Sequence, residues 1–235
     1  MMKRLIQYIC FLKKVSIIQF FYLNYFSKNI IRKDKSKIIP YKHSVIELEK
    51  NTKVFLSNGD IEIGCDRLKK SKTETIIRIK NGAEWKSVGG CKVSYGCTIE
   101  IFANAVFESK YFTMNCNSVA VISNRISFGH DVMIGRNVVI YDSDFHQILN
   151  ENKEVINQSR PVEIGDHVWL GVNVTVLKGS VIGSGSVIGA QTVINGRVGA
   201  DTIYQTKREG TERSGYGSWN RKYPNLIGEE GYHEE

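Results

Sequence analysis

Six consecutive hexapeptides between Ile164 and Gly199 constrain the fold of this 235-residue chain more than any other feature. Each begins with an aliphatic residue, the next residue is glycine in four of them, and the fifth place holds a small side chain such as Val168 or Ser180. The opening residues are Ile164, Leu170, Val176, Ile182, Ile188 and Ile194. A period of six fits neither an amphipathic helix nor an alternating strand, so it predicts a β-helix of short strands and corners. Three hexapeptides then make one triangular coil.

The same register continues upstream of these hexapeptides. Ile122, Phe128, Ile134 and Ile140 open a clear run, and weaker members begin at Val93, Ile99 and Ala105. Together they predict about five coils, a stack of roughly 25 Å at the spacing of paired strands. We therefore expect a β-helix domain over residues 51–205, preceded by a separate segment 1–50 and followed by an irregular tail 206–235.

A polar stretch, residues 146–163, interrupts the repeat and ends with Pro161 and the first residues of the next strand. It predicts a loop that leaves the solenoid, and loops on rigid scaffolds often carry function. His146 is the first residue of this expected loop. A lone surface histidine is usually only solvated, but Asp142 and Asp144 precede this one closely, and a carboxylate can orient an imidazole or stabilise its cation.

Three segments resemble the hexapeptide-repeat acyltransferases and, among them, the bacterial sugar O-acetyltransferases of capsule and lipopolysaccharide gene clusters. They are IGRNVVIYDSDFH (134–146), RPVEIGDHVWLG (160–171) and VLKGSVIGSGSVIGAQTVI (176–194). The resemblance implies an all-β, left-handed parallel β-helix and a homotrimer with active sites between adjacent prisms. It also implies acetyl transfer from acetyl-CoA to a sugar hydroxyl of a cell-surface polysaccharide or its precursor.

Roles for individual residues follow from the same resemblance. His146 corresponds to the family's general base, with Asp144 and Asp142 as supporting carboxylates. Asn117, or Asn115 next to it, lies at the distance upstream where related enzymes hold the acceptor, although either can equally be a corner residue.

The resemblance also indicates where acetyl-CoA would bind. Trp169 faces outward and lies either beside the acetyl-CoA channel or only against a neighbouring prism, while Ala190 matches a position whose backbone meets the pantetheine arm. Phosphates need cations. The candidates are Lys178, Arg197, Lys207 and Arg208. After Tyr204 the chain departs from the family, because the Gly-Gly-x-Pro-Ala-Lys type of turn is missing.

The N-terminal segment is distinguished by its charge. Residues 1–50 contain 11 Lys or Arg and 3 acidic residues, whereas the other 185 residues have 21 of each sign. The segment includes an apolar and aromatic run, residues 15–26, which is too short to span a bilayer. Two interpretations remain open: a helical cap over the first coil, which we favour, and a basic segment resting on anionic lipid. No nucleic-acid motif accompanies the basic charge, so we expect no nucleic-acid partner.

Other functions compete with sugar acetylation. The γ-type carbonic anhydrases use this solenoid with three zinc-binding histidines, two of them four residues apart, and His130, His146 and His167 lack that spacing. We therefore expect no metal. The changed tail favours a non-catalytic assembly protein, and another small hydroxyl acceptor such as serine is a further alternative. Five cysteines without a C-x-x-C pair favour a cytoplasmic protein, with any membrane contact peripheral.

Overall fold

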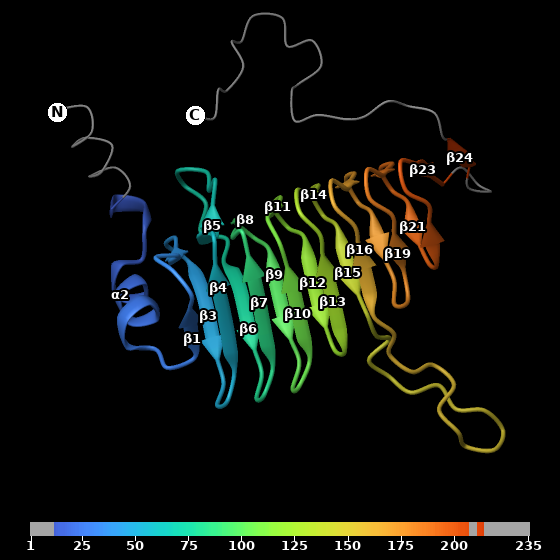
Figure 1. The fold of residues 1–235 in the computed structure, drawn as a ribbon, viewed down its shortest axis with the longest axis horizontal. Coiled ribbons are helices and arrows are strands. Elements are labelled where there is room, and N and C mark those ends of the chain that lie inside the picture. The colour runs from blue at the N-terminus through green and yellow to red at the C-terminus, as the bar shows by residue number, and fades with distance from the viewer. Residues whose placement is uncertain (1–11, 207–210, 214–235) are drawn as a thin grey trace, which may run out of the picture.

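A computed structural model describes residues 12–206 and 211–213 as a long prism (Figure 1). Three sheets run along the prism, and each sheet takes every third strand of the chain. Among the strands described, neighbours in a sheet pair in parallel, except that β24 pairs antiparallel with β23. The left-handed parallel β-helix expected from the sequence is confirmed.

The strands are short and become shorter toward the C-terminus. The first sheet contains β1 (Ile30–Arg32), β4 (Lys53–Ser57), β7 (Glu84–Val88), β10 (Val106–Ser109), β13 (Arg125–Phe128), β16 (Val162–Ile164), β19 (Val181–Ile182) and β22 (Arg197–Val198). The second contains β2 (Ile38–Pro40), β5 (Ile61–Cys65), β8 (Cys91–Ser94), β11 (Phe112–Met114), β14 (Val132–Ile134), β17 (Trp169–Leu170), β20 (Val187–Ile188), β23 (Ile203–Gln205) and β24 (Thr211–Arg213). The third contains β3 (Ser44–Leu48), β6 (Thr75–Ile79), β9 (Thr98–Ile101), β12 (Val119–Ile122), β15 (Val139–Tyr141), β18 (Thr175–Val176) and β21 (Val193–Ile194).

The solenoid starts earlier than the boundary expected at residue 51. A short α-helix, α2 (Ile17–Phe21), continues as a π-helical turn, η1 (Tyr22–Phe26), and β1, β2 and β3 follow before residue 50. The seven-stranded third sheet sets the number of complete coils in the described part of the chain at seven, rather than about five. Ile30 pairs with Val54 and Val54 with Trp85, so the first coils are longer than 18 residues and show no six-residue period.

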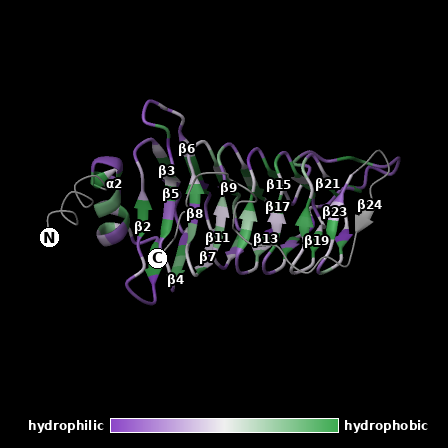
Figure 2. Ribbon diagram, turned by 90° about the horizontal axis from the view of Figure 1, so that it is seen from above, coloured by the Kyte–Doolittle hydropathy of each residue, from purple (hydrophilic) through white to green (hydrophobic). Residues whose placement is uncertain are grey.

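The core follows the hexapeptide pattern. The aliphatic residues that open the six C-terminal hexapeptides are at most 3% exposed, as are the residues at the fifth place. Hydrophobic residues lie along the strands while many turns are hydrophilic (Figure 2). The glycine after the opening aliphatic residue permits close stacking, because a Cβ added at Gly183 would lie 2.4 Å from the backbone nitrogen of Ala200. The interpretation of the repeat is therefore confirmed.

A layer of aromatic side chains fills the middle of the prism. The Phe107 ring lies 5.3 Å from the Trp85 ring, 6.0 Å from that of Phe112 and 5.0 Å from that of Phe128, measured between centroids. All four side chains are at most 3% exposed. They make the widest buried part of the core, where earlier coils would otherwise leave space between aliphatic side chains.

The strand register continues unchanged across the long loop between β15 and β16. Ile126 pairs with Val162, 36 residues later, whereas Ile164 pairs with Ile182, 18 residues later. The loop has therefore taken up chain equal to one 18-residue coil without shifting the strands that follow. At the other end of the domain, β24 lies within the tail 206–235, which we expected to be irregular throughout.

Candidate active site

The loop carrying His146 leaves the corner between the third and first sheets and projects away from the prism (Figure 1). It spans residues 142–161, because β15 ends at Tyr141 and β16 begins at Val162. The expected limits, 146–163, were thus displaced toward the C-terminus. Two chain ends meet at its base, where the Arg160 N–H donates a 3.0 Å hydrogen bond to the Asp142 carbonyl.

Asp142 supports the base of the loop from inside the prism. Its side chain is fully buried, and its two carboxylate oxygens accept hydrogen bonds from the backbone N–H groups of Ser123 (2.7 Å) and Asn124 (2.8 Å). Burial raises the pKa of Asp142, and these backbone hydrogen bonds oppose the rise. The structure therefore gives Asp142 a structural contact with the preceding coil, in place of the expected contact with His146.

Asp144 and Lys178 close the neck of the loop. The Asp144 carboxylate accepts hydrogen bonds from Lys178 Nζ at 2.5 Å and from the Asn157 side-chain amide at 2.9 Å. Lys178 also donates to the Asn157 carbonyl at 2.9 Å, and its side chain is only 14% exposed. Lys178, expected to meet a CoA phosphate, is thus used inside the loop. Its hydrogen bond is the main reason that the pKa of Asp144 is lowered.

His146 is held through its backbone and presents its ring to solvent. Its N–H donates to the Asp144 carbonyl at 2.7 Å, and its carbonyl accepts from the Asn157 side chain at 2.8 Å. In the part of the chain that the structure describes, the imidazole has no hydrogen-bond partner. The residue is exposed. A fixed backbone with an unpaired ring suits a group that receives a proton from a bound substrate.

Phe145, which the sequence reading did not single out, anchors the chain beside His146. Its ring lies 5.3 Å from that of Phe102 and 5.6 Å from that of Tyr141, on the outer side of the third sheet. Its backbone has φ 62°, an uncommon value for a residue other than glycine. The aromatic contacts hold this left-handed turn, which starts the chain outward immediately before His146. Asn157 was missed as well, since its contacts link residues far apart in sequence.

The remaining predicted residues lie at other corners and faces of the same chain. Asn115 and Asn117 are exposed at the corner between the second and third sheets, where Asn117 adopts φ 62° against Gly96. Ala190 lies three coils further along that corner. Trp169 is 39% exposed on the second sheet, which confirms its outward orientation, and Arg197 is exposed on the first. One chain therefore does not bring these residues to His146. Lys207 and Arg208 lie outside the described residues.

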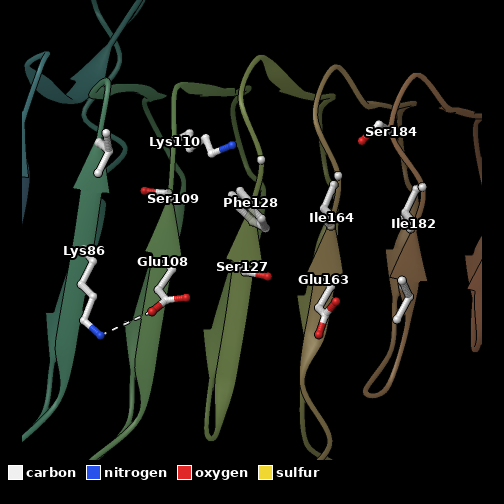
Figure 3. A pocket seen from close by; sticks show the side chains of 15 residues that line it. Lys86, Glu108, Ser109, Lys110, Ser127, Phe128, Glu163, Ile164, Ile182 and Ser184 are labelled. Carbon is white, nitrogen blue, oxygen red and sulfur yellow. Dashed lines mark hydrogen bonds and ion pairs between the residues drawn. The ribbon is translucent and has the colours of Figure 1, made fainter. Parts of the chain in front are cut away.

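A hollow of about 570 Å³ lies on the outer face of the first sheet (Figure 3). Side chains from five successive strands line it, and Lys86 bonds to Glu108 across its edge at 3.3 Å. None of the predicted site residues lines this hollow.

The other two histidines considered for zinc lie at the corner between the first and second sheets. His167 Nδ1 lies 2.6 Å from an Asp131 carboxylate oxygen, and the His130 N–H donates to Asp166 at 2.6 Å. The structure shows no group of three potential metal ligands among the residues it describes. These contacts join consecutive coils.

Neutralising Lys178 should loosen the loop while leaving the prism intact. In Lys178→Met we expect amide hydrogen exchange across 144–157 to become up to about fivefold faster, the effect of losing one exposed ion pair and its hydrogen bond. Because the folded pKa of Asp144 is lowered, its contribution is present above the unfolded pKa and disappears as pH falls through the folded pKa. The wild-type loop should therefore loosen in acid. Lys153→Met, at the exposed loop tip, is the control, and equal exchange in the two variants would contradict the clamp.

Comparison with known proteins places this geometry in a family. Residues 161–196 match the family described as bacterial transferase hexapeptide, with six repeats. The chain is a member of the hexapeptide-repeat transferase family. It is 37% identical over 91 residues to a polysialic acid O-acetyltransferase of Neisseria meningitidis, covering 38% of this chain and 39% of that protein.

Further similarities of this hexapeptide-repeat protein concern shorter segments or the fold. It is 40% identical over 55 residues to a polysialic acid O-acetyltransferase of Escherichia coli O1:K1 / APEC, covering 23% of this chain and 18% of that protein. The crystal structure of the polysialic acid O-acetyltransferase OatWY aligns at 24% identity with a TM-score of 0.48, over 84% of this chain and 93% of that one. The chain spans less than half the length of the two curated relatives.

Proposed function

We propose that the protein transfers an acetyl group from acetyl-CoA to a hydroxyl of a cell-surface polysaccharide or its sugar precursor, with His146 as general base. The observation that carries the proposal is the exposed, unpaired imidazole of His146 on a loop clamped by Asp144, Asn157 and Lys178. The names of the two relatives above favour a sugar hydroxyl over serine as the acceptor.

The chemistry requires one proton transfer and no covalent enzyme intermediate. His146 takes the proton from the acceptor hydroxyl as its oxygen bonds to the thioester carbonyl carbon. The carbon–sulfur bond then breaks, and the CoA thiolate takes a proton, so that the products are the O-acetyl ester and free CoA. Proton removal is assigned to His146 because its ring is unpaired, whereas both carboxylates nearby are occupied by other partners.

A homotrimer is part of this proposal. Trp169, Ala190 and Arg197 lie at other faces and corners of the chain that carries His146, so they can serve the same reaction only if adjacent prisms meet. In such a site, the loop of one prism would meet the acetyl-CoA residues of its neighbour. Asn115 and Asn117 share their corner with Ala190, which would place acceptor and donor contacts along one edge.

We further propose that the reaction takes place in the cytoplasm. The described cysteines, Cys65, Cys91, Cys97 and Cys116, are free and buried. Burial raises the pKa of Cys97 to about 12, so this thiol stays protonated and packs in the core. Free thiols of this kind accord with a reducing compartment.

Acetyl transfer can be tested by following free-thiol release from acetyl-CoA with polysialic acid, other capsular polysaccharides, their sugar precursors and serine as acceptors. We expect release above the water background with at least one sugar acceptor, and mass spectrometry should then find an alkali-labile O-acetyl ester. A melting curve provides a second measurement, since acetyl-CoA at 100 times its Kd should add about 2.7 kcal/mol to the free energy of unfolding.

Two results would contradict the proposal. Folded protein that neither releases thiol with any sugar nor melts higher with millimolar acetyl-CoA would favour the non-catalytic solenoid. Release with serine but with no sugar would retain the enzyme and replace the acceptor.

A further inference from the structure

The helical segment Ile17–Phe26 covers the N-terminal end of the prism with its inner side (Figure 1). Leu23 is 3% exposed and packs in the hydrophobic core. The Asn24 amide donates to the Ile38 carbonyl at 2.7 Å, and its oxygen accepts from the Ile38 N–H at 3.0 Å and from Arg32 at 2.9 Å. These contacts close the first strand of the second sheet, so a polar side chain performs the capping.

The outer side of the same segment is apolar. Six large side chains recur in adjacent pairs every four residues, as one face of a helix requires. They are Ile17 (47% exposed), Ile18 (85%), Phe21 (52%), Tyr22 (57%), Tyr25 (60%) and Phe26 (73%). A surface helix normally shows the opposite arrangement, with apolar residues inward and polar residues toward water. We call these six residues the apolar cap face.

Basic side chains surround the apolar cap face. Lys13 and Lys14 precede it, Lys28 follows it, and all three are exposed. Lys37 Nζ lies 4.7 Å from the centroid of the Tyr25 ring. Across residues 12–50 the charge is strongly positive, while the rest of the chain is balanced. Aliphatic and aromatic side chains bordered by lysine are the composition that enters the boundary between lipid headgroups and acyl chains.

We propose that the apolar cap face binds the surface of an anionic lipid bilayer, lying in the interfacial plane. In the described part of the chain, no helix is long and apolar enough to cross a membrane. The charge complementarity favours acidic headgroups, and the tyrosine and phenylalanine side chains match the amphipathic interface. The face lies at one end of the prism, so the solenoid extends away from the lipid surface (Figure 1). This binding is independent of the acetyl-transfer proposal.

The test is co-sedimentation of the full chain with vesicles of phosphatidylglycerol and phosphatidylcholine, or of phosphatidylcholine alone. We expect binding to the anionic vesicles that weakens with salt, and little binding to the neutral ones. Ile18→Ser with Phe26→Ser should lower the partition coefficient at least tenfold. Lys13→Glu with Lys14→Glu should lower it about fivefold or more for each lysine. Leu68→Ser, which removes a 66% exposed leucine between β5 and β6, should leave binding unchanged.

Exposure of all substituted residues makes misfolding easy to exclude, because each variant should melt close to the wild type. Failure of the wild-type chain to sediment with anionic vesicles at low salt would overturn the proposal. Equal binding by wild type and both double variants would do the same. A change in oligomeric mass in the serine variant without lipid would instead assign the face to contact with a second copy of the chain.

Discussion

Replacing His146 with alanine should lower kcat for acetyl transfer by about 10²–10⁴-fold, the usual contribution of a general base. The ring is exposed and unpaired in the described structure, whereas the backbone carries the contacts with Asp144 and Asn157. Its removal should therefore leave the loop, the fold and KM for acetyl-CoA almost unchanged. Thiol release at saturating acceptor, combined with a melting curve, measures both expectations.

His130→Ala is the matched control for this substitution. His130 is also exposed, but it lies at the corner between the first and second sheets, away from the loop. Its backbone N–H, which donates to Asp166, is retained in the variant. We expect activity within about twofold of wild type, as for most surface substitutions away from a site. If His146→Ala were as active as His130→Ala, His146 would not be the base.

Replacing Phe107 with alanine should cost about 3–5 kcal/mol in the free energy of unfolding. The ring is fully buried and contacts Trp85, Phe112 and Phe128, so its removal leaves a cavity that rigid coils above and below cannot fill. For a chain of this size we expect Tm to fall by about 10 °C or more. Denaturant titration followed by circular dichroism gives the corresponding free energy.

Phe21→Ala provides the comparison for the core variant. The same side chain is deleted, but Phe21 is 52% exposed on the apolar cap face, so a smaller loss of stability is expected, within about 0.5 kcal/mol. Similar Tm values for the two variants would mean that the aromatic layer does not pack as described.

The sequence was most informative where the coils are regular. Between Ile164 and Gly199 every coil has one length, so each core residue shows directly as a six-residue period. Upstream, strands such as β4, β5 and β6 are five residues long and are joined by turns of different lengths. Their inward residues alternate within a strand, but no fixed interval links one strand to the next. The first coils were therefore assigned to a separate N-terminal segment, although they obey the same packing.

The candidate site was predictable only as far as local sequence carried it. His146 stood out because a polar insertion interrupts a periodic pattern at that point. The partners of Asp144 could not be foreseen, because Asn157 and Lys178 are 13 and 34 residues away and meet it only when the loop closes on the next coil. Asp142 resembled Asp144 in sequence, yet the alternation of β15 turns its carboxylate into the prism.

The undisturbed register across the loop makes the scaffold and the loop separable in design. Since the insertion accounts for one coil's worth of chain, β16 resumes in the place that β13 prescribes, whatever the insertion contains. Closing a longer loop adds only about 0.6 kcal/mol for each doubling of its length. Loops of other lengths and compositions could therefore be grafted between Tyr141 and Val162 without repacking the prism. Acceptor preference could then diverge among such proteins while the structure that supports it stays the same.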